Sequence, residues 1–263
     1  MRDRSIRILG AGDEDALCAF VLPRLASSVF LLGNMRAGGL ADHGQVYQGT
    51  YAAAWRGEEI MGVAAHYWQG NLILQAPEQL DRLWAAALRS SGRPLTGLLG
   101  PTVQVARALE QMGLGSDACL LNQAEWLYSL ELDELVVPPP LASGAVCGRA
   151  MEPRDLDLIT AWEVDYQRES FGDEAAEASR ADRRASAERQ LAEGRMWLVE
   201  KGGQPVACAG FNAVSPEVVQ VGEVWTPPAH RCHGYARAAV ATALLSARAR
   251  GVRRRAHGVC PGR

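Results

Sequence analysis

Apolar positions recur along this chain with two different periods, which predict a mixture of helices and strands. In the C-terminal part, Leu156, Ile159, Trp162 and Tyr166 share one face of a helix that Pro153 opens. Short apolar runs between turn residues predict strands instead. The predicted order there is a strand at 145–150, the helix just described, a second helix near 174–193, strands at 196–200, 205–211 and 218–225, and a long alanine-rich helix.

The N-terminal part shows a similar succession of elements. It predicts helices near 13–26, 28–37, 78–90 and 101–112, and strands near 51–56, 60–67, 71–75, 95–99 and 125–132. Residues 135–144 include three consecutive prolines, which predict an extended linker. We therefore predict an N-terminal domain at 1–135, a linker at 136–144 and a C-terminal domain at 145–263.

Composition limits the classes of protein to consider. A chain of 263 residues, 48% of them hydrophobic, is long enough for one large or two modest globular domains. No uninterrupted apolar run reaches the length of a membrane span and the N-terminus is charged, so we expect a cytoplasmic protein without membrane contact. The net charge of −3 argues against nucleic-acid binding, and the basic run at 248–255 is interpreted as a solvated helix end.

The segment from Val224 to Arg237 carries the candidate chemistry. It joins a strand-like run to a helix through a turn that contains Gly234. Unpaired N–H groups at a helix N-terminus and the positive end of the helix dipole favour a bound anion, and a glycine lets the backbone approach it. Other phosphate loops are excluded, because Lys201 is the only lysine and the Gly10-x-Gly12 segment lacks a third glycine.

Arg231, Gly234 and Ala236 resemble the Gln/Arg-x-x-Gly-x-Gly/Ala acetyl-CoA motif of the GNAT acyltransferase superfamily. The order of the predicted elements around them resembles the first two-thirds of a GNAT domain. The N-terminal part resembles a second, degenerate copy, in which Gln75-Ala76-Pro77-Glu78 stands at the place of the motif. The resemblance implies an α/β (α+β) fold with a mixed sheet flanked by helices, in two tandem copies.

The resemblance also implies a set of site residues. Backbone amides of the strand before the motif would hold the pantetheine of acetyl-CoA and polarise its carbonyl. The predicted acetyl-CoA-binding residues are Val224, Trp225, Thr226, Arg231, Cys232, His233, Gly234, Tyr235, Ala236 and Arg237. Glu223 is the candidate catalytic base if burial raises its pKa; the alternative is a solvent-facing strand carboxylate.

Two further groups of residues bear on the chemistry. His230 and His233 flank Cys232 without a fourth ligand, and the six cysteines form no Cys-x-x-Cys pair, so we expect neither a metal site nor a disulfide framework. A run of carboxylates follows in the first helix of the C-terminal domain, where it would either attract a cationic amine or form a solvated face. These carboxylates are Glu163, Asp165, Glu169, Asp173 and Glu174.

The end of the chain departs from the family pattern. A GNAT domain continues with a fifth strand and a helix that carries the tyrosine usually serving as the general acid. Here three arginines, a glycine and a proline follow Val252. We therefore expect an incomplete C-terminal domain, and Tyr235 does not occupy the place of the acid.

Together these observations predict an N-acetyltransferase. It would move an acetyl group from acetyl-CoA, its co-substrate, to a primary amine of a small molecule or peptide. The alternatives are a catalytically weak or inactive acyl-CoA-binding or scaffold protein, and a structural pair of domains without a ligand. The sequence leaves the oligomeric state open, a homodimer included.

Overall fold

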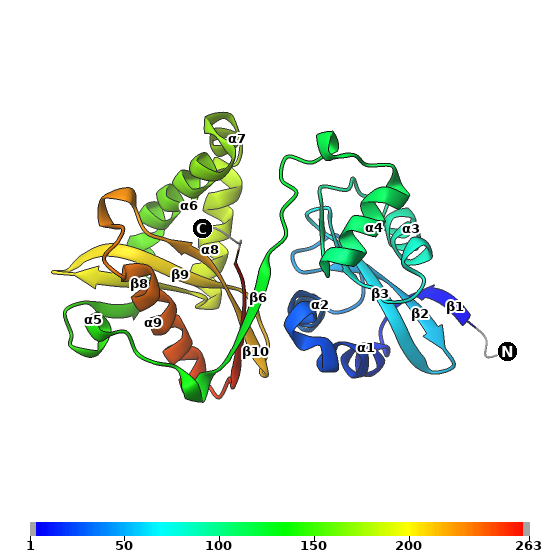
Figure 1. Cartoon of the computed structure of the whole chain (residues 1–263), viewed down its shortest axis with the longest axis horizontal. Coiled ribbons are helices and arrows are strands. Elements are labelled where there is room, and N and C mark those ends of the chain that lie inside the picture. Colours follow the sequence, from blue (N-terminus) through cyan, green and yellow to red (C-terminus); the bar gives the residue numbers. More distant parts are fainter. Residues whose placement is uncertain (1–3, 260–263) are drawn as a thin grey trace. The chain divides into compact units, whose positions relative to one another are not determined.

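The computed structural model describes residues 4–259, which form two compact units. One unit consists of the residues up to Tyr128 together with the last residues from Gly258, and the other of Ser129–His257. Both contain a mixed sheet with helices packed on it (Figure 1).

The first unit holds a five-stranded sheet in the order β1-β2-β3-β4-β5. Its first three pairs of neighbours are antiparallel, and β4 and β5 are parallel. The strands are β1 (Arg4–Ile8), β2 (Gly49–Arg56), β3 (Glu59–Tyr67), β4 (Asn71–Gln75) and β5 (Gly97–Leu99). The α-helices are α1 (Glu14–Val21), α2 (Leu25–Gly38), α3 (Leu80–Ser91) and α4 (Thr102–Met112).

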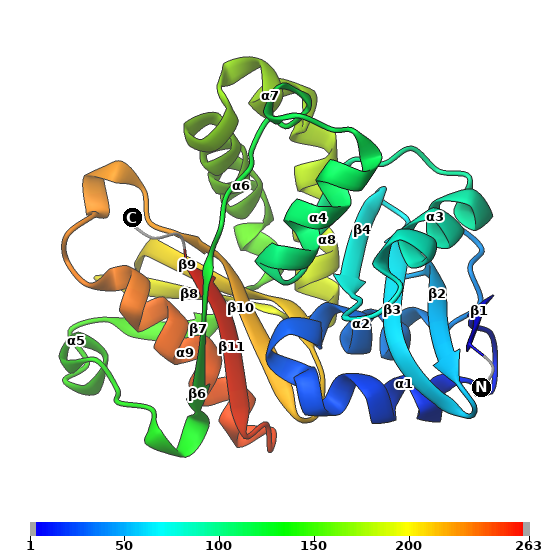
Figure 2. The ribbon, with the colours of Figure 1, turned by 45° about the vertical axis from the view of Figure 1, so that its right-hand side comes forward.

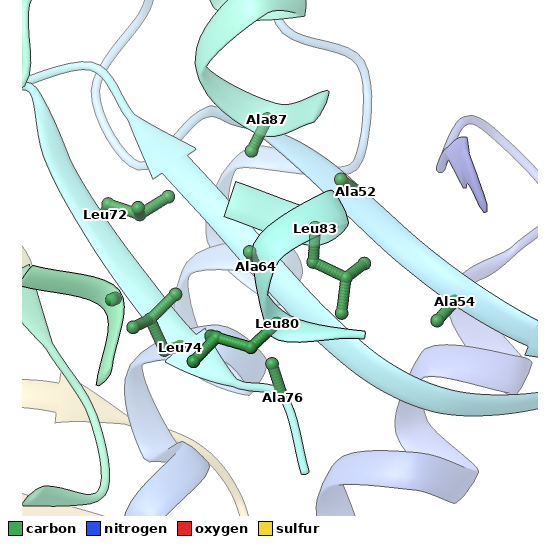
Figure 3. Close-up of a cluster of buried hydrophobic side chains, with 10 residues drawn as sticks. Ala52, Ala54, Ala64, Leu72, Leu74, Ala76, Leu80, Leu83 and Ala87 are labelled. Atoms are coloured by element: carbon green, nitrogen blue, oxygen red, sulfur yellow. The ribbon is translucent and has the colours of Figure 1, made fainter. Parts of the chain in front are cut away.

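Helices cover both faces of this first sheet. On one face, alanines and leucines of β2, β3 and β4 pack against Leu83 and other residues of α3 (Figure 3). On the other face the buried Tyr51 donates a hydrogen bond from its hydroxyl to the carbonyl oxygen of Leu31 in α2, at 3.1 Å. Alternate strand residues therefore serve two cores, as the period of two in a strand requires.

The second unit holds a six-stranded sheet in the order β6-β11-β10-β9-β8-β7. Strands β7 to β10 pair antiparallel in succession, and β10 pairs parallel with β11, which lies beside it in Figure 2. The strands are β6 (Trp126–Glu131), β7 (Cys147–Ala150), β8 (Met196–Lys201), β9 (Gln204–Val214), β10 (Val218–Trp225) and β11 (Arg254–Val259). The α-helices are α5 (Pro139–Ala142), α6 (Leu156–Phe171), α7 (Asp173–Ala178), α8 (Arg180–Glu193) and α9 (Tyr235–Ala249).

The faces of the second sheet are divided in the same way. Val199 of β8 packs with residues of α9, whereas its neighbour Leu198 packs with Ile159 of α6 and Ala187 of α8. In both sheets an antiparallel run is followed by a parallel pair, with helices on both faces, and the second sheet has β6 in addition beside β11. The expected α/β fold, with mixed sheets flanked by helices, is confirmed.

Several elements differ from the sequence-based expectations. The helix expected at 174–193 is two helices, α7 and α8, and the linker at 135–144 contains the one-turn helix α5. Strand β1 was not expected, and the strand expected at 125–132 in the N-terminal domain forms β6 of the second sheet. The segment after Val252, whose sequence is unlike that of a buried central strand, nevertheless forms β11, which pairs with residues 218–220 of β10. Backbone groups make such pairing, so it needs no apolar run.

One stretch of helix resembles a membrane span in its composition. Residues Glu14–Gly38 form a helical segment of 25 residues that is long and apolar enough to cross a membrane. No segment of this kind was expected from the sequence. Leu17, Val21, Leu31 and Leu32 within it are fully buried. Such burial is what a core helix of a globular unit shows.

Candidate functional site

Strand β10 carries a bulge at Glu223. Gly222 lies opposite Gly210 and Trp225 lies opposite Cys208, so two residues of β10 face one residue of β9. Glu223 has a φ of 50°, in the left-handed region, and its carbonyl accepts a hydrogen bond from the Cys208 thiol at 3.7 Å. A bulge disrupts the ladder locally and leaves peptide groups unpaired with the neighbouring strand. The backbone of Glu223 and Val224 can therefore bind a ligand.

The side chains after the bulge point to alternate sides. Val224 packs in the core beneath α9. Trp225 is 8% exposed and packs with Trp162 of α6 on the other face, with the ring of Tyr166 edge-on at 6.0 Å. Thr226 is half-buried. Of these three predicted residues, Val224 thus has its side chain in the core, and only its backbone can serve a ligand.

The turn between β10 and α9 ends in an uncapped helix N-terminus. Gly234 is the N-cap residue of α9 with φ 78°, no side chain caps the helix, and its first turn holds no acidic residue. The first helical hydrogen bond runs from the Ala238 amide to the Gly234 carbonyl, at 3.2 Å. The amides of residues 235–237 precede this bond, and helix geometry gives them no partner. Such amides and the helix dipole favour an anion, and the cradle at this turn stays a prediction.

The backbone conformation gives a second reason for glycine at 234. A Cβ added there would meet no protein atom within 4 Å, so close packing does not require glycine. Its positive φ does, because a side chain strains that backbone conformation. The exposed Cys232 has a similar φ of 64° without being a glycine.

Three side chains of the cradle are held by protein contacts. The Arg231 guanidinium donates to the Thr226 carbonyl at 3.0 Å, pairs with Glu169 of α6 at 2.6 Å and lies 5.0 Å from the Trp225 ring. The buried Tyr235 ring stacks on His233, with centroids 5.3 Å apart. Tyr235 therefore offers its amide, and not its side chain, to a ligand. Ala236 is half-buried and Arg237 is exposed.

Glu223 is half-buried, and its carboxylate is directed at α8. Its carboxylate accepts a hydrogen bond from the side-chain amide of Gln190 in α8. Burial raises the pKa of Glu223, and the charges of Arg183 and Arg189 lower it in part. This environment argues against the solvent-facing alternative, and the catalytic role of Glu223 stays a prediction.

Glu163 of α6 is a residue of this site that the sequence analysis did not separate from its neighbours. Both of its carboxyl oxygens are buried without a hydrogen-bond partner in the described part of the chain. Burial first, and the charge of Glu223 second, raise its pKa to about 8, against the charges of Arg183 and Arg189. The signal was its spacing, because Ile159, Glu163 and Tyr166 follow each other at i, i+4 and i+7 on the apolar face.

The other carboxylates of the predicted acidic group do not lie with Glu163 and Glu223. Asp165 and Asp173 pair with Arg168, and Glu169 pairs with Arg231. Glu174 is exposed. Within residues 4–259 no group of three or more His, Cys, Asp or Glu side chains is arranged to hold a metal ion.

The corresponding turn of the first unit is closed by its own side chains. The Ala76 amide donates to the side-chain oxygen of Gln104 at 2.7 Å. Glu78 pairs with Arg56 at 2.7 Å, and Gln79 has a φ of 55° before α3 begins. An internally bonded amide and a carboxylate at this position disfavour a second anion there.

Comparisons with known proteins agree with this geometry. The model of the "Acetyltransferase (GNAT) family" matches residues 156–260. A tandem GNAT protein from the clavulanic acid biosynthesis pathway has a TM-score of 0.54 at 15% identity, covering 99% of this chain and 91% of its own.

Two further structures are similar over nearly the whole chain. A GCN5-related N-acetyltransferase from Kribbella flavida has a TM-score of 0.55 at 16% identity, covering 97% of this chain and 87% of its own. A Drosophila protein has a TM-score of 0.62 at 11% identity, covering 98% and 90%. A search of curated proteins found no match. The acetyltransferase (GNAT) family model thus matches most of the second unit, and the similar structures share the fold of the whole chain.

Proposed function

We propose that the second unit transfers an acetyl group from acetyl-CoA to a primary amine of a small molecule or peptide. One observation carries this proposal: a single connecting segment, residues 226–234, leads from the end of β10 with its bulge at Glu223 to the uncapped N-terminus of α9. The first feature offers backbone groups to the pantetheine and thioester, and the second offers amides to the pyrophosphate.

The proposed reaction uses Glu223 as the base. The acceptor ammonium loses one proton to the Glu223 carboxylate, and the resulting amine nitrogen forms a bond to the thioester carbonyl carbon. The carbon–sulfur bond then breaks, and the CoA thiolate takes the second nitrogen proton. The products are the acetamide and CoA thiol, with one proton left on Glu223. A raised pKa of Glu223 suits this role, because a base works best when its pKa is near the working pH.

Release of CoA thiol from acetyl-CoA, measured over amines that include aminoglycosides, polyamines and peptide N-termini, tests the proposal. We expect turnover with at least one class, and Glu223→Gln to lower kcat by about 10²–10⁴ without weakening acetyl-CoA binding. Asp165→Asn, an exposed carboxylate on α6, is the matched control with unchanged turnover. Wild-type turnover in Glu223→Gln would remove Glu223 as the base. If acetyl-CoA binds but no CoA thiol is released in the presence of any of these amines, the acyl-CoA-binding alternative is favoured.

A further inference from the structure

Buried polar atoms without a hydrogen-bond partner gather around Glu223. Within the described part of the chain they include side-chain atoms of Glu163, Arg183, Gln190, Trp225 and Thr226. Gln190 bonds Glu223 through its amide nitrogen, and the charges of Glu163, Arg183 and Glu223 act on one another. Trp225 and Thr226 lie two and three residues after Glu223 along the chain. Such atoms are rare in folded proteins, because each gives up its hydrogen bonds to water. Their gathering at one place points to a ligand that bonds them.

On Glu163 and Gln190 the unpaired atoms are hydrogen-bond acceptors, whereas those on Arg183 and Trp225 are N–H donors. Glu163 offers two carboxyl oxygens. Gln190, which is 7% exposed, offers its carbonyl oxygen because its nitrogen is directed at Glu223. A ligand that satisfies such a set must donate several hydrogen bonds from one small group. An ammonium group, with three N–H donors and a positive charge, does so.

The charges near these atoms fit a cation. Glu163 and Glu223 repel each other, so at neutral pH the pair retains a proton that an entering cation can replace. The charges of Arg183 and Arg189 of α8 lower both pKa values in part and so favour the ionised forms. Cys208 of β9 adds no charge, because burial raises the pKa of its thiol.

We propose that Glu163, Gln190 and Glu223 form the subsite that binds the ammonium group of the acceptor, with Glu163 as its specificity-determining carboxylate. This inference rests on the proposed function of the second unit. Binding of the ammonium displaces the proton that the two carboxyl groups share. The ionised Glu223 is then ready to take a proton from the nitrogen it faces. The acceptor class is accordingly a cationic amine, and not an alcohol or a neutral amide.

Two coenzyme A thioethers test the subsite without knowledge of the natural acceptor. S-(2-aminoethyl)-CoA places an ammonium near the thioester position, and S-propyl-CoA is its uncharged counterpart of similar size. Calorimetric titration of the full chain with each, between pH 6.5 and pH 8.0, gives the preference for the cation. Titration in buffers of different ionisation enthalpy gives the protons released.

We expect the wild type to bind the aminoethyl ligand at least about tenfold more tightly than the propyl ligand, and to release a proton at pH 7. The preference should rise by roughly tenfold toward pH 8.0, as the pair loses its shared proton. In Glu163→Gln the preference should fall below about threefold and no longer depend on pH, with unchanged affinity for S-propyl-CoA. Asp165→Asn should behave as the wild type.

The outcomes separate the two levels of the account. If the wild type and Glu163→Gln show the same preference for the aminoethyl over the propyl ligand, and both bind S-propyl-CoA normally, the ammonium subsite is overturned. The proposed coenzyme site is not affected by that result. Failure of the wild type to bind either thioether would contradict the proposed function, and the subsite with it. Proton release is measured on the wild type, so its absence overturns the subsite even if Glu163→Gln does not fold.

Discussion

At the scale of the residue, Glu163 links the site to the stability of the fold. Its surroundings hold its pKa at about 8, whereas a glutamate without them titrates at 4.5. Folding therefore takes up a proton between these two values. Because the folded pKa lies above the unfolded one, the free energy of unfolding falls as the pH rises through this window and levels off above it.

This gives a prediction for Glu163→Gln. Between pH 5 and pH 8 the unfolding free energy of the wild type should fall by about 2–4 kcal/mol more than that of the variant. Urea unfolding at pH 5, 6.5 and 8 measures both curves. Parallel curves would show that Glu163 does not carry a raised pKa in the folded chain.

In the proposed complex, Glu169 would compete with the coenzyme for Arg231. The two side chains form an exposed ion pair, with 39% of the Arg231 side chain and 50% of the Glu169 side chain accessible to solvent. Glu169→Gln should raise the affinity for acetyl-CoA by at most about fivefold, because exposed ion pairs contribute about 0.2–1 kcal/mol. Arg231→Glu should abolish binding, since it places an anion at the pyrophosphate. Calorimetry with acetyl-CoA measures both, and weaker binding by Glu169→Gln would contradict the competition.

At the scale of the element, the N-terminus of α9 is left available for an anion at a cost to the helix. No acidic residue stands in its first turn, where one would interact favourably with the dipole. Arg237→Glu should stabilise the fold by about 0.3–1 kcal/mol and weaken acetyl-CoA binding at least tenfold. Thermal unfolding and calorimetry give the two values.

Arg107→Glu makes the same charge change on an exposed residue of α4 and should leave the affinity unchanged. Stronger binding of acetyl-CoA by Arg237→Glu would show that the anion lies elsewhere.

The elements that could be predicted from the sequence are those whose pattern is local. Helix α6 and strands β8 to β10 show periodic apolar positions of their own, and the cradle follows from a strand, a glycine and a helix. Strand β11 exists through its pairing with β10, and β6 joins a sheet made of residues far along the chain. Neither relation leaves a local signal. The inward position of Glu163 was readable from its spacing, but its pairing with Glu223 required the sheet.

At the scale of the whole molecule, one fold occurs twice and the cradle once. Both units run through an antiparallel series to one parallel pair. In the first, Gln104 bonds the Ala76 amide and Glu78 stands in the turn; in the second, the first amides of α9 have no cap. We infer that the first unit has a structural role and that the chain binds one coenzyme.

Calorimetric titration of the full chain with acetyl-CoA tests the central claim most directly, because it reports whether the coenzyme binds and at how many sites. The account predicts one molecule per chain in the wild type and no binding by Arg231→Glu. Absence of binding to the wild type, two molecules per chain, or unchanged affinity in Arg231→Glu would contradict it.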